Sequence, residues 1–232
     1  MGKIKALFKY FTTFEKVLWC SSIVLIIASF CVFDRCNYLT LIASLVGVTS
    51  LIFCAKGNPA GQILMIIFSI LYGIISLSFA YYGEMITYLG MTLPLAIFAL
   101  VSWLKNPYKG NKSEVKVSKL SKKSFIVMCI LTIIVTIVFY FILEALNTSN
   151  LIVSTISVTT SFMAAFLTFK RSPYYALLYA FNDVVLIILW ILASIKNSSY
   201  ISIVVCFFVF LVNDLYCFFN WLKMSKRQNK AN

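Results

Sequence analysis

Histidine is absent from the 232 residues, and acidic residues are few, with seven Asp and Glu against twenty Lys and Arg. Without histidine there is no HExxH zinc motif, no histidine-based triad and no histidine general base. The chain also has no GxxxxGK[ST] loop for direct coupling to ATP, and its seven cysteines include no CxxC pair. The sequence therefore gives no support to a membrane enzyme and predicts neither a cofactor nor a metal site.

Charge of either sign is scarce as well, because only 12% of the residues are charged while 62% are hydrophobic. No soluble domain of this size can cover so much apolar surface, so we expect an all-α integral membrane protein. A helix needs about 20 predominantly apolar residues, within a range of about 17 to 25, to cross the bilayer. Eight segments qualify, over residues 17–33, 38–55, 62–81, 85–103, 124–146, 151–169, 174–195 and 200–221.

The cations lie between the apolar segments and not on one face of a soluble domain, so the net charge of +13 does not indicate nucleic-acid binding. Their clusters fall at alternate ends of the eight segments, as the positive-inside rule predicts for cytoplasmic ends. Both termini are then expected to be cytoplasmic. An interfacial amphipathic helix is expected over residues 4–15, before the first span. The clusters are Lys3, Lys5, Lys9 and Lys16, residues 105–123, Lys170 with Arg171, and residues 223–230.

Two short matches indicate an internal repeat. The basic turn at residues 55–59 matches that at 169–173, and Trp103-Leu104-Lys105 matches Trp221-Leu222-Lys223. Both matches lie in register with the predicted topology. They predict helices arranged as one, three, one and three, with two parallel triplets, a repeat class found in transporters. The predicted units are 1–37 (amphipathic segment and extra helix), 38–104 (first triplet), 105–150 (basic loop and linker helix), 151–223 (second triplet) and 224–232 (basic tail).

Polar groups inside two spans are candidates for a ligand site. Asn182-Asp183 and Asn213-Asp214 each lie roughly 12 Å from the inner end of their helix, at about 1.5 Å per residue. An ionised acid at the centre of a span costs about 2.5 to 3.5 kcal/mol, so such residues are functional candidates by default. The aspartates can equally serve as a helix–helix contact or as the counter-charge of a ligand.

Helical spacing assigns further candidates to the same faces. We interpret Asn182, Asn213 and Trp190 as ligand contacts, and hydroxyls such as Ser157 and Thr160 as hydrogen bonds between helices. The candidate faces carry Tyr175, Tyr179, Asn182 and Trp190 in the seventh span, Asn213, Tyr216 and Asn220 in the eighth, and Gln62 and Tyr72 in the third. Pro94 is expected to kink the fourth span.

The chain resembles the PnuC family of bacterial vitamin transporters over about residues 35 to 223. These transporters look like full-length relatives of the two-triplet, SWEET-like sugar transporter fold. The resemblance is carried by Gly47, Ala55-Lys56-Gly57, Tyr81-Tyr82-Gly83-Glu84, Trp103-Leu104-Lys105, Asn182-Asp183 with Leu189-Trp190, and Asn213-Asp214-Leu215-Tyr216 with Asn220-Trp221.

The resemblance implies uptake of nicotinamide riboside across a bacterial cytoplasmic membrane by facilitated diffusion, with trapping by a cytosolic kinase. Asn182 and Asn213 would contact the ribose or carboxamide, and a trimer is implied. One departure is that Tyr175, Leu178 and Tyr179 stand where family members often carry tryptophan. Thiamine, riboflavin or deoxynucleosides are therefore alternative substrates, and a proton-coupled carrier using Asp183 and Asp214 is an alternative mechanism. A receptor or scaffold is disfavoured because the outer loops are short.

Overall fold

The computed structural model describes residues 10–78 and 82–230. Over these residues eight helical segments are long and apolar enough to cross a membrane, which confirms the predicted span count. They are α2 (Thr13–Phe33), α3 (Tyr38–Ala55), α4 (Ala60–Ser78), a fourth span built of α5, η1 and α6, then α7 (Lys122–Ala145), α8 (Leu151–Phe169), α9 (Tyr175–Ser194) and α10 (Ile201–Lys230). The interfacial helix expected over residues 4–15 lies largely outside the described residues, and α2 already begins at Thr13.

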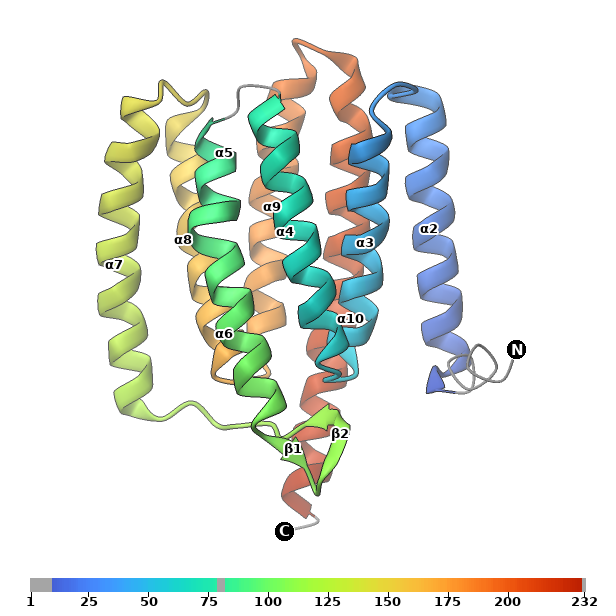
Figure 1. Ribbon diagram of the computed structural model, residues 1–232, viewed down its shortest axis with the longest axis vertical. Helices are drawn as coiled ribbons and strands as arrows, with labels where there is room; N and C mark the ends of the chain where they lie inside the picture. Colours follow the sequence, from blue (N-terminus) through green and yellow to red (C-terminus); the bar gives the residue numbers. More distant parts are fainter. Residues whose placement is uncertain (1–9, 79–81, 231–232) are drawn as a thin grey trace.

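Six of the spans close into a ring, in which contacts run from α3 to α4, α6, α8, α9, α10 and back to α3. The other two lie outside it, since α2 packs on α3 and α10 while α7 packs on α8 (Figure 1). The isolated position of α7 agrees with its low burial. Only 17% of its apolar stretch is buried, against 56% for that of α3. The beginning of α2 and the end of α10 lie at the same end of the bundle, which follows from an even number of spans (Figure 1).

The fourth span is not a regular α-helix. It consists of α5 (Tyr82–Ile86), the π-helix η1 (Thr87–Thr92) and α6 (Leu93–Leu104). The amide of Leu93 bonds the carbonyl of Tyr88, five residues earlier. The next residue, Pro94, has no N–H to donate to the preceding turn. This missing donor favours the wider π-helical turn at this point. The predicted kink at Pro94 thus takes the form of a π-helical turn.

The basic loop between α6 and α7 contains a small antiparallel hairpin, β1 (Pro107–Tyr108) with β2 (Asn111–Val115), which the all-α prediction did not include. The hairpin packs on α10, which continues as a helix to Lys230 through the segment predicted to be a separate basic tail. Gln228 accepts a hydrogen bond from the Val117 amide at 2.8 Å, and Arg227 forms an ion pair with Glu114. A polar end of α10 therefore has a structural use outside the membrane.

The start of α2 is tied to the ring by one buried acid. Glu15 lies in a capping box with Thr12, which fixes the first turn of the helix. Its carboxylate also meets the Lys56 ammonium at 3.2 Å and accepts a hydrogen bond from the Tyr216 hydroxyl at 2.9 Å. These partners compensate the burial of Glu15, which is only 2% exposed.

Candidate functional site

A small central cavity of about 50 Å³ lies inside the ring of helices. Its position between the two predicted triplets makes it the best candidate for a transported solute, because transporter sites lie near the midplane at the interface between repeats. Every helix of the ring except α6 contributes to it, and η1 takes the place of α6. The lining residues are Leu51, Met65, Phe68, Tyr88, Thr92, Ser161, Tyr179, Asn182, Asp183, Leu186, Phe207, Phe210 and Asp214.

Asn182 lies in this cavity and is held in one orientation. Its amide oxygen accepts hydrogen bonds from Thr160 at 2.9 Å and from Ser157 at 3.2 Å, both on α8. The two hydroxyls interpreted as helix–helix contacts therefore also position the amide. With the oxygen occupied, the NH₂ group is the part of Asn182 that is available to an acceptor on a ligand.

Asp183 on α9 and Asp214 on α10 both line the cavity and lie close enough to interact with each other. Both are almost fully buried, at 4% and 3% exposure. Among the described residues, Oδ2 of Asp183 and Oδ1 of Asp214 have no hydrogen-bond partner. Two carboxyl groups so close together call for a shared proton or a nearby cation. Among the described residues, no group of three or more His, Cys, Asp or Glu side chains could hold a metal ion.

Aromatic rings form much of the remaining wall, and apart from Tyr179 these residues were not among the sequence candidates. Phe68 lies 5.8 Å from Phe210 and 6.0 Å from Tyr88, measured between ring centroids. Phe207, Phe210 and Asp214 stand at i, i+3 and i+7, so one face of α10 supplies both rings and acid. This helical spacing could have identified Phe207 and Phe210 as site residues from the sequence. The predicted Tyr72 packs 4.5 Å from the Tyr88 ring but is not itself in the cavity wall.

Asn213 lies on a different face of α10 from Asp214 and does not share a pocket with Asn182. Its amide nitrogen donates to Ser22 of α2 at 3.0 Å and to the Val209 carbonyl at 2.8 Å. Tyr216 on the same face bonds Glu15, and Asn220 donates to the Ala55 carbonyl at 2.7 Å. The predicted eighth-span face of Asn213, Tyr216 and Asn220 therefore packs against α2 and α3.

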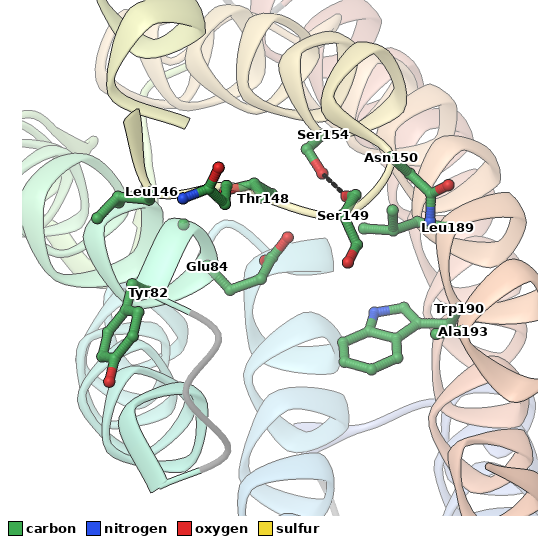
Figure 2. Close-up of a pocket in the computed structure, with 12 residues that line it drawn as sticks. Tyr82, Glu84, Leu146, Thr148, Ser149, Asn150, Ser154, Leu189, Trp190 and Ala193 are labelled. Atoms are coloured by element: carbon green, nitrogen blue, oxygen red, sulfur yellow. Dashed lines mark hydrogen bonds between the residues drawn. The ribbon is translucent and has the colours of Figure 1, made fainter. Parts of the chain in front are cut away.

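Trp190 lies in a second opening of about 170 Å³ at the end of the bundle opposite the hairpin. Figure 2 shows its indole and the Glu84 side chain extending into the same space, from α9 and α5. Leu189 and Trp190 follow Leu186 of the central cavity by one turn of α9, so the two spaces lie one above the other along that helix. Trp190 therefore lines the second opening and not the central cavity.

The opposite side of the cavity is closed by aromatic residues. Trp103 and Trp221 are fully buried with their rings 5.3 Å apart, and Tyr175 packs edge-on against Trp221 at 4.9 Å. Trp103 donates to the Thr168 carbonyl at 2.9 Å, and Trp221 donates to the Cys54 carbonyl at 2.8 Å. Each tryptophan thus ends one triplet and bonds the end of the first helix of the other triplet.

Neighbouring positions repeat this exchange, since Ser102 bonds the Phe169 carbonyl at 2.8 Å while Asn220 bonds that of Ala55. These contacts lie at positions that the predicted duplication makes equivalent. Two predicted site residues also belong to this closure. The Tyr175 hydroxyl donates to the Cys54 carbonyl at 3.3 Å, and Gln62 donates to the Cys54 sulfur at 3.3 Å. Of the predicted residues, the structure brings together in the cavity only Tyr179, Asn182, Asp183 and Asp214.

Known proteins are similar to this chain in fold and in sequence. The solved structure described as the crystal structure of the Vitamin B3 transporter PnuC matches with a TM-score of 0.80 and 26% identity, covering 94% of both chains. The nicotinamide riboside transporter PnuC of Neisseria mucosa is 26% identical over 97% of this chain and 87% of its own length. The protein of the same name from Haemophilus influenzae is 24% identical over 83% of each chain.

These relatives are transporters, in agreement with the prediction of a transporter and not an enzyme. The family model for the nicotinamide mononucleotide transporter matches residues 37–223, which include both predicted triplets and the helix between them. The chain is therefore a multi-pass membrane transporter and belongs to the nicotinamide mononucleotide transporter family.

Proposed function

We propose that this protein carries nicotinamide riboside, the molecule named for both bacterial relatives, through the central cavity. The observation that carries the proposal is the wall of that cavity, where a fixed amide, two facing carboxyl groups and several aromatic rings meet. Nicotinamide riboside offers a cationic pyridinium ring, a carboxamide and ribose hydroxyls. Each of these groups has a complement among the lining residues.

The cation is the most selective part of this match. A pyridinium is attracted to aromatic faces by roughly 0.5 to 2 kcal/mol, and the carboxylates of Asp183 and Asp214 add to that attraction. The NH₂ group of Asn182 can donate to the carboxamide oxygen or to a ribose oxygen. Thiamine is also a cation with an aromatic ring and satisfies the same chemistry, so it is the alternative substrate that the cavity favours over neutral riboflavin or deoxynucleosides.

Transport by alternating access follows from the size of the cavity. A space of about 50 Å³ holds one or two water molecules, so a nucleoside enters only when the surrounding helices move apart. In the proposed cycle the two triplets rock about the cavity. The closure around Trp103 and Trp221 opens on one side, and the approach past Glu84 and Trp190 opens on the other.

No coupling ion is needed if the solute is consumed after entry. We propose facilitated diffusion down a gradient that a cytosolic kinase maintains by phosphorylating the riboside. The basic hairpin end of the bundle, with both termini, then faces the cytoplasm of a bacterial cell, as the positive-inside rule predicts. The Trp190 opening faces outward.

Purified protein in liposomes tests this function directly. Labelled nicotinamide riboside should equilibrate across the membrane without accumulating, at a rate that does not depend on a pH gradient. A competition series with thiamine, riboflavin and deoxynucleosides should place nicotinamide riboside first. Preferential uptake of thiamine would reassign the substrate and leave the transport mechanism intact.

Proton coupling is the second candidate mechanism, and the facing pair Asp183 and Asp214 is the observation that favours it. A pair that holds one proton in one conformation and releases it in another would couple solute movement to protons. In that case an imposed proton gradient drives accumulation, and Asp183→Asn abolishes the accumulation while equilibration persists. Equal behaviour of the wild type and Asp183→Asn under a gradient would exclude this mechanism.

A further inference from the structure

The two equivalent basic turns of the repeat are completed in different ways. Gly57, after α3, and Arg171, after α8, both have left-handed backbone, with φ of 66° and 56°. The basic loop contacts both, because the Val115 amide bonds the Gly57 carbonyl at 2.9 Å and the Ser118 amide bonds that of Arg171 at 3.0 Å. The second turn therefore has Arg171 in a left-handed backbone conformation, which glycine adopts without a steric cost.

The first turn has its charge neutralised within the protein. The Lys56 ammonium, 19% exposed, pairs with Glu15 at 3.2 Å and donates to the Tyr10 carbonyl at 3.0 Å. Burial also raises the pKa of the nearby Tyr10 hydroxyl, which stays neutral and donates to the Ser113 carbonyl. Nothing at this turn calls for an external ligand.

The second turn has two cations and no acid. Among the described residues, no carboxylate pairs with Lys170 or Arg171. The Arg171 guanidinium donates to the Ser102 hydroxyl at 3.2 Å, but its Nε is buried without a partner. The Lys170 ammonium lies over the Phe169 ring at 4.9 Å. Burial lowers the pKa of Arg171, because the cation has lost water without gaining a counter-charge.

These cations border an open pocket of about 350 Å³ at the hairpin end of the bundle, beside α7. The pocket also contains the exposed Lys119 and four serine hydroxyls, those of Ser102, Ser118, Ser121 and Ser124. Ser121 caps the 24-residue helix α7 by accepting a hydrogen bond from the Ser124 amide, so the N-terminus of this helix lies beside the pocket. Three cations, four serine hydroxyls and a helix N-terminus are the groups that suit an anion with several oxygen acceptors, such as phosphate.

An apolar groove continues from this pocket along the outer face of α7. It contains about 430 Å³ at the first turn of α7 and is lined by Leu120, Phe125 and Ile126, with Ser121 and Lys122 at its polar end. Phe125 and Ile126 are 52% and 57% exposed, on a helix that contacts the bundle through one side only. A ligand that fits both spaces has an anionic head at the membrane–water interface and a hydrocarbon chain beside α7.

We propose that the pocket of Lys119, Lys170 and Arg171 binds the phosphate of an anionic phospholipid, with an acyl chain in the groove of Phe125 and Ile126. The site lies between helices at the basic end of the bundle, where such lipids are bound by other membrane proteins. With the orientation proposed above, the lipid belongs to the cytoplasmic leaflet. The bound lipid would join α7 to the α8–α9 turn and so hold the linker helix against the second triplet.

Native mass spectrometry of the purified full chain, titrated with phosphatidylglycerol or phosphatidylcholine of the same chain length, tests this site. Phosphatidylglycerol should bind at least tenfold more tightly than phosphatidylcholine. Arg171→Gly, which suits the left-handed backbone, and the exposed Lys119→Ala should each reduce that affinity about tenfold. Lys112→Ala removes the same charge from the exposed hairpin at the same end and should leave the affinity unchanged.

Two results would overturn the proposal. Equal binding of phosphatidylglycerol to the wild type and to both pocket variants would show that the lipid binds elsewhere. Binding of glycerol 3-phosphate as tightly as phosphatidylglycerol would assign the pocket to a soluble phosphate and remove any role for the groove. The readout is lipid binding, so neither result depends on which solute the protein transports.

Discussion

Replacing Trp221 by phenylalanine removes the N–H that holds the end of α10 to the Cys54 carbonyl and keeps most of the ring that fills the closure. The Cys54 carbonyl retains the Tyr175 hydroxyl as a donor at 3.3 Å, so no buried acceptor is left unsatisfied. The expected loss is therefore at least the net value of one hydrogen bond, about 1 kcal/mol, because the smaller ring also leaves part of a fully buried site unfilled. If the closure opens during transport, that loss raises the population of the open state about fivefold.

Two native thiols report this opening. Cys54 and Cys217 lie in the closure and are 3% and 0% exposed, so they react with a maleimide only when it opens. Mass spectrometry of the alkylated protein should show both thiols reacting about fivefold faster in Trp221→Phe than in the wild type. Trp103→Phe, which removes the equivalent bond to the Thr168 carbonyl, should have the same effect.

Trp19→Phe is the matched control, because Trp19 donates to Thr49 at 3.2 Å from the peripheral helix α2. It loses the same kind of hydrogen bond away from the closure and should leave both alkylation rates unchanged. If Trp103→Phe and Trp221→Phe leave the reactivity of Cys54 and Cys217 at the wild-type level, the exchanged tryptophans do not control opening. Acceleration in Trp19→Phe as well would point to general loosening of the bundle instead.

Three further predictions follow from the positions of single side chains. Asn182→Ala should weaken nicotinamide riboside binding about tenfold by calorimetry, from loss of one fixed donor worth about 1 to 2 kcal/mol, and unchanged affinity would place the ligand outside the cavity. Asn213→Ala should instead lower stability by about 1 kcal/mol through its lost bond to Ser22 and leave the affinity for nicotinamide riboside unchanged. A selective loss of that affinity would show that Asn213 contacts the ligand. Glu15→Gln keeps one acceptor oxygen, replaces the other by an NH₂ donor and loses the charge that faces Lys56, so it should destabilise the protein by at least about 1 kcal/mol in a melting experiment. A melting temperature equal to the wild type would show that the pair contributes nothing.

The sequence by itself determined the membrane architecture. Eight apolar stretches of sufficient length, separated by cations at alternate ends, leave few other folds open, because backbone polar groups in lipid must be satisfied within helices. It also identified Asn182, Asp183 and Asp214 as expensive groups inside spans, since the position of a polar residue within an apolar stretch gives its depth in the bilayer. The small hairpin in the basic loop was not predicted, because its two short strands are stabilised by contacts with the far end of α10.

Tertiary structure decided which of these groups meet. Helical spacing placed Asn213 and Asp214 on adjoining faces of α10, but it does not state which neighbour each face contacts. Because six spans pack into a ring, the α10 face of Phe207, Phe210 and Asp214 lies toward the cavity. Helix α2 covers the α10 face of Asn213. The environment of a side chain in a bundle depends on the order of the helices around it. That order is set by packing among residues far apart in the chain, which no local pattern records.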